Sequence, residues 1–196
     1  MRLISTFRPL PPPALGALLR ASMERLARPT TLLALDVGER RVGVAVSHSE
    51  LLGVLPHRTL QRRPGRETQF AEELRAVVRE TSASALVVGW PLELSGNAGP
   101  QCGRVARLLS SVALMGSLDD LGLCSEATAA LRAKDDGDAA LPVLPVTFWD
   151  ERFSTREAIE NIDEDLSLST KRRVVDPLAA ALIMQGFLDY ENHWDA

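Results

Sequence analysis

The chain has 196 residues, of which 45% are hydrophobic and 24% are charged, and its formal net charge is −4. This composition is typical of one globular domain with appendages, and the acidic balance argues against a protein that coats nucleic acid generally. No apolar run reaches the length that a membrane-spanning helix needs, so no membrane partner is expected. The two cysteines, Cys102 and Cys124, have neither the spacing of a zinc site nor that of a disulfide framework.

The first 29 residues differ in composition from the rest of the chain. They contain five arginines and one acid, Glu24, with an amphipathic piece around residues 15–26. Such a segment is typical of a mitochondrial or plastid transit peptide; the alternative is an extension that precedes a true start at Met23. In either case we expect residues 1–29 to lie outside the fold, which leaves a domain at 30–190 and a tail at 191–196. The protein is expected in the cytoplasm, or in a mitochondrion or plastid if the extension is a transit peptide.

Apolar periodicity predicts the elements of an α/β domain. Residues 32–37 and 42–47 form a hairpin around a Gly-containing turn, and residues 52–60 form a third antiparallel strand. Helices and short apolar strands follow. The expected helices are 67–80, 101–115 and 154–161, and the expected strands are 85–89 and 143–149. A last helix is expected to begin at Asp176-Pro177, with the proline in its first turn.

Residues 117–142 interrupt this pattern. They contain six acids and two bases, and their apolar periodicity is weak. We interpret them as an insertion, an exposed loop with room for one short helix. The remaining order, a three-strand meander followed by strand–helix units, predicts a mixed β-sheet in which an antiparallel meander is joined by parallel strands and flanked by helices.

Acidic residues stand beside the apolar runs at three places: Asp36, the pair Asp150 and Glu151, and Asp176. Each alone has an ordinary structural explanation, in a hairpin turn, a surface ion pair or a helix N-terminus. Together they would converge on one sheet edge, where their repulsion favours a divalent cation such as Mg²⁺ or Mn²⁺. Neighbours in a strand face opposite ways, so one member of the pair is expected to bind. Reach favours Glu151, with Asp150 as the alternative.

Four blocks of the sequence carry a resemblance: "LALDVGERRVGVAVS", "ALVVGWPLELSGNAG", "WDERFSTREA" and "VVDPLAAALIMQGFL". They resemble the motifs of the YqgF/RuvX family, whose members have a ribonuclease H-like fold and are described as Holliday junction resolvases or pre-16S rRNA nucleases. The resemblance covers residues 30–190 apart from the insertion. Its specific part is the combination of "DERFST" with "VDPLAAALI" at the right distance.

The resemblance implies a divalent-metal-dependent nuclease. In this chain the metal-binding catalytic acids would be Asp36, the acid of the "DER" block and Asp176, and Arg152 in the same block would orient that acid or contact phosphate. Two positions depart from the family pattern. Trp90 stands where an aliphatic residue usually follows the strand glycine, and Pro177 replaces a small polar residue.

Basic residues close to these acids are candidates for contacts with nucleic-acid phosphates, although a basic run is more often a solvated surface. They are Arg41 after the first acid and the run Lys171, Arg172 and Arg173 before the last one; Arg62, Arg63 and Arg66 cluster in a separate loop.

The favoured substrate is structured RNA, and the favoured role is processing of the small-subunit (16S-type) rRNA precursor, with a ribosomal precursor particle as partner. One alternative is a Holliday junction resolvase in DNA recombination and repair, which would act on branched DNA as a homodimer. Another is a non-catalytic RNA-binding factor in ribosome assembly. An ATPase of the actin-like class is disfavoured, because the chain is short and has no second phosphate-binding segment.

Overall fold

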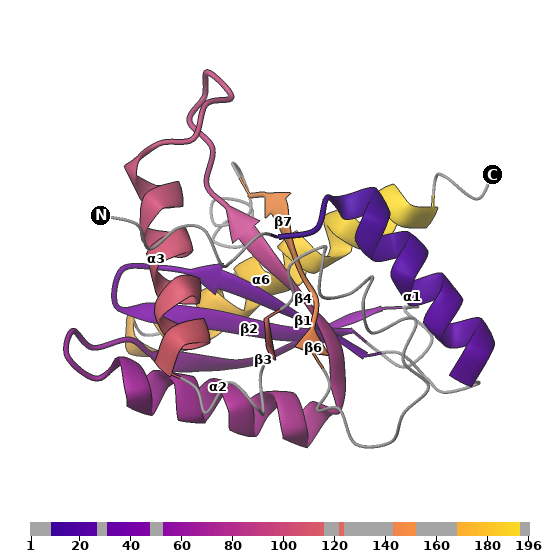
Figure 1. The fold of residues 1–196 in the computed structure, drawn as a ribbon. Helices are drawn as coiled ribbons and strands as arrows, with labels where there is room; N and C mark the ends of the chain where they lie inside the picture. Colours follow the sequence, from indigo (N-terminus) through magenta and orange to yellow (C-terminus); the bar gives the residue numbers. More distant parts are fainter. Residues whose placement is uncertain are drawn as a thin grey trace.

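The computed structural model describes residues 9–26, 31–47, 53–115, 122–123, 143–151 and 168–192. Helices cover both faces of a central sheet (Figure 1). The helices are α1 (Pro12–Leu26), α2 (Glu67–Thr81), α3 (Pro100–Met115) and α6 (Leu168–Asn192). The strands of the central sheet are β1 (Thr31–Val37), β2 (Arg41–Ser47), β3 (Val54–Gln61), β4 (Ala83–Trp90) and β7 (Val146–Asp150). Two short strands, β5 (Gly122–Leu123) and β6 (Val143–Leu144), pair with each other in parallel.

The strand order of the central sheet is β3-β2-β1-β4-β7. Strands β1, β2 and β3 form an antiparallel meander, and β4 and β7 run parallel to β1. This arrangement confirms the predicted mixed sheet, in which an antiparallel meander is joined by parallel strands. Because parallel strands share a direction, the carboxyl ends of β1, β4 and β7 lie at one edge of the sheet.

Two hydrophobic cores lie on opposite faces of the sheet, as the alternation of strand side chains requires. Leu33 and Leu35 of β1 belong to the core that α2 and α3 cover, whereas Leu32 and Ala34 belong to the core that α1 and α6 cover. The next even-numbered position of β1 is Asp36, so its carboxylate is on the α6 face.

The N-terminal segment is part of the second core. The backbone N–H of Leu10 donates to the carbonyl of Val146 at 2.8 Å, and the hydroxyl of Thr147 donates to the carbonyl of Leu10 at 2.8 Å. Leu15 and Leu19 of α1 are buried. The expectation that residues 1–29 lie outside the fold is therefore wrong for residues 9–26. The arginine-rich composition hides two features that hold this segment. Leu15 and Leu19, four residues apart, share one face of a helix and can pack on the sheet. The edge strand β7 offers backbone groups with which Leu10 can pair.

Helix α6 begins earlier than predicted. It starts at Leu168, eight positions before Asp176, and Pro177 lies inside it. Proline removes one backbone hydrogen bond of a helix without preventing the turns before it, and the buried residues Ile183 and Phe187 hold the following turns against the sheet. Asp176 is thus a mid-helix residue, and the interpretation of this acid as one favoured by a helix N-terminus is wrong.

The remaining predictions have mixed outcomes. The aromatic residues at the end of β7 pack against other rings: Phe148 stacks on Trp90 with ring centroids 4.2 Å apart, and Trp149 meets Phe187 edge-on. The predicted helix 154–161 lies outside the described residues, as does the 117–142 insertion except for β5. In the part of the chain that the structure describes, no helix combines the length and apolarity needed to span a bilayer.

Candidate active site

Asp36 and Asp176 are brought together where α6 crosses β2. Asp36 is paired in register with Gly43 of β2, and a Cβ atom on Gly43 would fall 1.9 Å from the backbone oxygen of Asp176. The helix backbone therefore lies directly on the strand at Gly43. Only glycine permits this approach, and it places Asp176 beside the carboxylate of Asp36.

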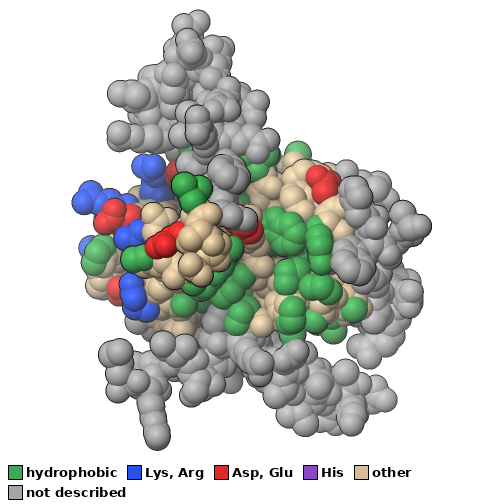
Figure 2. Space-filling view, turned by 90° about the horizontal axis from the view of Figure 1, so that it is seen from above, with side chains coloured by type: hydrophobic (Ala, Val, Ile, Leu, Met, Phe, Trp, Pro, Cys, Tyr) green, Lys and Arg blue, Asp and Glu red, His purple; other side chains and the backbone are tan. Residues whose placement is uncertain are grey.

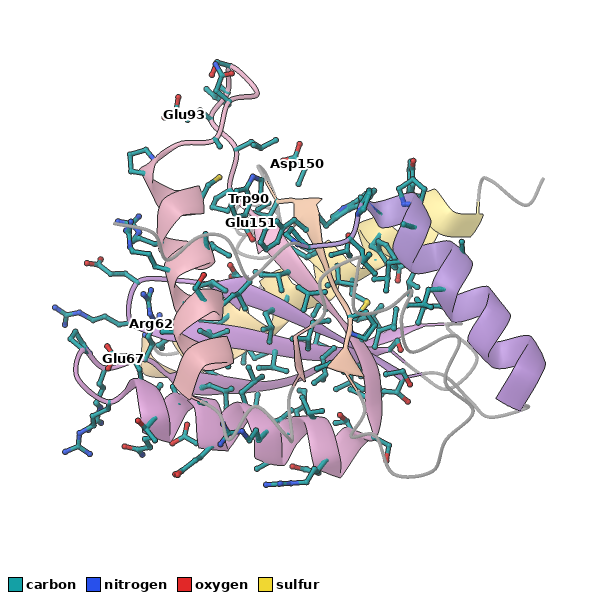
Figure 3. All side chains as sticks on the ribbon, in the orientation of Figure 1. Arg62, Glu67, Trp90, Glu93, Asp150 and Glu151 are labelled. Carbon is teal, nitrogen blue, oxygen red and sulfur yellow. The ribbon has the colours of Figure 1, made fainter. Side chains whose placement is uncertain are left out.

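Glu151, which directly follows β7, lies at the same edge of the sheet as Asp36. Its backbone N–H donates to the carbonyl of Trp90 at 3.4 Å, which holds the end of β7 against the end of β4. A Cβ atom on Gly89 would fall 1.6 Å from Oε2 of Glu151, so the carboxylate occupies the space above this glycine. Leu35 of β1 pairs with Val88, and Gly89 is thus alongside Asp36. Figure 3 shows Glu151 near Trp90 at this end of the sheet.

The two central acids hold protons far more tightly than ordinary carboxyl groups. The pKa of Glu151 is raised to about 8, first by burial and then by the charges of Asp36 and Asp150. The pKa of Asp36 is raised to about 6, first by burial and then by the charge of Asp176. Each of these effects disfavours the ionised form. At neutral pH Glu151 therefore mostly keeps its proton beside the ionised Asp36, and a bound cation would favour the ionised form of both acids.

Arg41 neutralises only one of the three acids. Its Nε donates to Oδ2 of Asp176 at 2.5 Å and its Nη2 lies 3.5 Å from Oδ1, a fork that matches the carboxylate. Both side chains line a hollow of about 240 Å³ together with Asp36 and the turn between β1 and β2. We call it the first pocket.

A second pocket of about 560 Å³ opens beside Glu151. It is bounded by the loop after β4 and by the first turn of α3, and Glu93 and Arg104 contribute to its wall. The acids thus lie between two hollows, with Asp36 and Asp176 on the first and Glu151 on the second.

The chemistry of these donors fits a hard divalent cation, because carboxylate oxygens are the ligands that Mg²⁺ and Mn²⁺ prefer. A cation would also offset the charges of neighbouring acids, which disfavour ionisation of both Asp36 and Glu151. The arrangement is not a closed cage. Among the residues that the structure describes, no group of three or more Asp, Glu, His or Cys side chains is placed to hold a metal ion, and Asp176 directs its carboxylate to Arg41. The donor types fit, and the third ligand is engaged by an arginine.

The other residues predicted for the site lie elsewhere or outside the described part. Asp150, the alternative to Glu151, is exposed at the end of β7. Arg152 lies outside the described residues. Lys171, Arg172 and Arg173 belong to the first turns of α6, and their side chains are not among those described. The structure therefore gathers Asp36, Glu151, Asp176 and Arg41, and their roles in catalysis or metal binding stay predictions.

Two positioning residues, Gly43 and Gly89, were missed in the sequence. Both lie inside strands, on the face that meets α6, where a side chain would collide with an acid or with the helix. Glycine in a strand interior is a known sign of close backbone approach. The sequence therefore showed that something approaches these two glycines, but it did not show that the approaching residues are Asp176 and Glu151.

Known proteins similar to this chain carry nuclease names. A protein of Desulfitobacterium hafniense, named a candidate pre-16S rRNA nuclease, is 32% identical over 160 residues, which cover 81% of this chain and 92% of that protein. A protein of Rhodospirillum centenum with the same name is 36% identical over 180 residues, which cover 91% of this chain and 81% of that protein. Among solved structures, Thermus thermophilus RuvC in complex with a Holliday junction substrate aligns with 82% of this chain and 95% of its own, at 14% identity and a TM-score of 0.43.

The model of one protein family matches almost the whole chain outside the N-terminal segment. It covers residues 30–139 and 137–190, and the family is described as Holliday junction resolvase. The matched ranges contain all three acids and Arg41. With relatives of more than 30% identity along most of their length, these matches show that the chain belongs to the RuvX family.

Proposed function

We propose that this protein is a divalent-metal-dependent endonuclease that hydrolyses phosphodiesters of structured nucleic acid. One observation carries the proposal. The carboxylate of Glu151 lies over Gly89 beside Asp36, at a sheet edge where burial and the charges of neighbouring acids raise both pKa values. A fold that depends on packing alone gains nothing from two half-buried acids whose ionised forms are disfavoured. In a site that binds a cation together with an anionic substrate, these two acids would serve as ligands of the cation.

The metal would be held by Asp36, Glu151 and Asp176, with Asp150 as the alternative to Glu151. When bound, Mg²⁺ or Mn²⁺ supplies a Lewis acid that activates water and stabilises the departing oxygen of the phosphodiester. Arg41 contributes from the chain itself. It pairs with Asp176 and lines the first pocket, so a substrate phosphate entering that pocket competes for its guanidinium and can orient against it.

The proposed substrate is the small-subunit rRNA precursor, within a ribosomal precursor particle. The names of the relatives support it, since those covering more than 80% of this chain are named as candidates for this nuclease. The family description favours the alternative, resolution of Holliday junctions, a function for which the protein would act as a homodimer. The third candidate is a non-catalytic RNA-binding assembly factor. The ion pair between Arg41 and Asp176 would suit this function, because it occupies a carboxylate that a metal ion would otherwise bind.

Cleavage of two labelled substrates by the purified full chain tests these candidates. One substrate is a structured RNA that spans an end of 16S-type rRNA with its flanking precursor sequence, and the other is a four-way DNA junction. Each is incubated with Mg²⁺, with Mn²⁺ and with EDTA. Asp36→Asn and Glu151→Gln should abolish cleavage and retain binding, whereas Asp189→Asn, an exposed acid of α6 bonded to Gln185, should leave both unchanged.

The outcomes separate the three functions. Metal-dependent cleavage of the RNA supports the precursor nuclease, and cleavage of the junction alone supports the resolvase. Binding by the wild-type protein without cleavage of either substrate in any metal would exclude the nuclease and leave the assembly factor.

A further inference from the structure

Three arginines from two distant segments meet on the α3 side of the site. Arg62 directly follows β3, and Arg104 and Arg107 lie one turn apart in α3. Residues three apart on a helix share a face, so Arg104 and Arg107 project together. Figure 3 shows Arg62 beside α3, and Figure 2 shows Lys and Arg side chains gathered on that side of the molecule.

Arg62 is held in place by the turn that precedes Arg41. Its backbone N–H donates to the carbonyl of Arg40 at 2.8 Å, and its Nη1 donates to the carbonyl of Gly38 at 3.3 Å. The same turn lines the first pocket. The position of Arg62 is therefore coupled to the turn next to Asp36 and does not depend on the substrate.

The charges around Arg62 are only partly balanced. Its pKa is lowered first by partial burial and then by the positive charges of Arg104 and Arg107, while Glu67 and Glu39 act in the opposite direction. Glu67 is also engaged with its own loop, because its Oε1 accepts the backbone N–H of Gly65 at 3.1 Å. At Arg62 the repulsion from the two arginines exceeds the attraction of the two carboxylates, so an anion bound there would be stabilised.

Arg104 extends this cluster to the candidate active site. It lines the second pocket, on whose wall Glu151 also lies. The second pocket is thus lined both by an acid of the site, Glu151, and by an arginine of the cluster, Arg104. The first pocket repeats this pattern with Asp36 and Arg41.

We propose that Arg62, Arg104 and Arg107 bind a backbone phosphate of the substrate strand on the α3 side of the cleavage site. The strand then runs from the first pocket, past Asp36 and Glu151, into the second pocket, with an arginine contact on each side of the scissile bond. This inference rests on the proposed function for the identity of the strand as substrate. The occupant is a nucleic-acid phosphate, since a strand passing between the two pockets presents phosphates at regular spacing.

Binding in EDTA tests the proposal separately from cleavage. Fluorescence anisotropy measures the Kd of the labelled structured RNA over a range of salt concentrations, for wild type and for Arg104→Gln/Arg107→Gln. Removing one arginine that binds a phosphate reduces the slope of log K against log salt by about 0.7 to 0.9. The double variant removes two of the three arginines around this one phosphate, so we expect it to reduce the slope by about 0.7 to 0.9 and to bind on the order of tenfold more weakly. Arg104→Lys/Arg107→Lys should keep most of the slope, because it keeps both charges.

The matched control is Arg58→Gln/Arg79→Gln, which removes the same charge elsewhere. Arg58 is paired with Glu80 at 2.6 Å, and Arg79 lies in the last turn of α2, roughly 18 Å along that helix from its start near Arg62. The single variant Arg107→Gln, at an exposed position, covers the case in which the double variant does not fold.

An unchanged slope in both Arg104→Gln/Arg107→Gln and Arg107→Gln would overturn the proposal, and so would an equal reduction in the control. If the wild-type protein cleaves no substrate while the slope falls as expected, the proposed nuclease fails and the phosphate site stands. If Asp36→Asn abolishes cleavage while the arginine variants bind like wild type, the nuclease stands and the phosphate site fails.

Discussion

Gly43→Ala should damage the site, because the added methyl group would collide with the backbone of α6. The added Cβ would lie 1.9 Å from the backbone oxygen of Asp176, and real Cβ atoms essentially never approach another atom closer than 3.0 Å. Strand β2 or helix α6 must therefore move by at least about 1.1 Å, the difference between these distances. The obstacle is backbone, which cannot rotate away as a side chain can.

Two effects of different size are expected from this movement. Overpacking of a dense interface costs about 1–3 kcal/mol of unfolding free energy. A displacement of about 1 Å in a catalytic group costs on the order of 100-fold in rate. Activity should thus fall well beyond what the loss of folded protein explains, since a domain that remains mostly folded at 25 °C would lose little of its active fraction.

Urea unfolding and single-turnover cleavage of the labelled RNA, measured on the same preparations, separate the two effects. Gly53→Ala is the matched control, because no heavy atom lies within 4 Å of the Cβ it would add. If Gly43→Ala cleaves at the wild-type rate and unfolds at the wild-type urea concentration, the close crossing of α6 over β2 does not position Asp176, and the reasoning fails.

Three further results are expected. Without metal, the unfolding free energy should fall as pH rises from about 4.5 to about 8, because Glu151 retains a proton in the folded state that the unfolded chain has lost; urea titrations in EDTA should show a flatter profile for Glu151→Gln, and an unchanged profile would contradict the raised pKa. Arg41→Gln should raise the pKa of Asp36 above about 6, since the acid paired with the arginine loses its counter-charge; carboxyl ¹³C NMR against pH measures this, and a lowered value would refute it. Leu15→Ala should cost about 2–5 kcal/mol in unfolding free energy because this side chain is fully buried, while Leu55→Ala at an exposed position should cost under about 0.5; equal values would mean that α1 is not part of the core.

The fold was largely predictable because its signals are local and periodic. A continuous apolar run in 32–35 and the alternating valines of 42–46 mark a hairpin, and the helical spacing of Phe70, Leu74 and Val77 marks α2. The prediction was wrong where a local rule was overridden by packing. Pro177 suggested a helix start, yet α6 continues through it, and the arginine-rich N-terminus suggested a detached segment, yet Leu10 joins β7 and α1 covers the sheet.

The sequence by itself determined where the acids stand in the strands and which end of the sheet they share. Alternation places Asp36 at the end of a buried strand on a known face, and the order of the elements sends the strand that precedes Glu151 to the same edge. Only the tertiary structure decided the distances. Gly43 and Gly89 open space for Asp176 and Glu151, Arg41 pairs with one acid, and Arg62 lies within the electrostatic influence of Arg104. All of these are relations between residues far apart in the chain. Periodicity states which way a side chain points, but what it meets depends on how closely two elements pack.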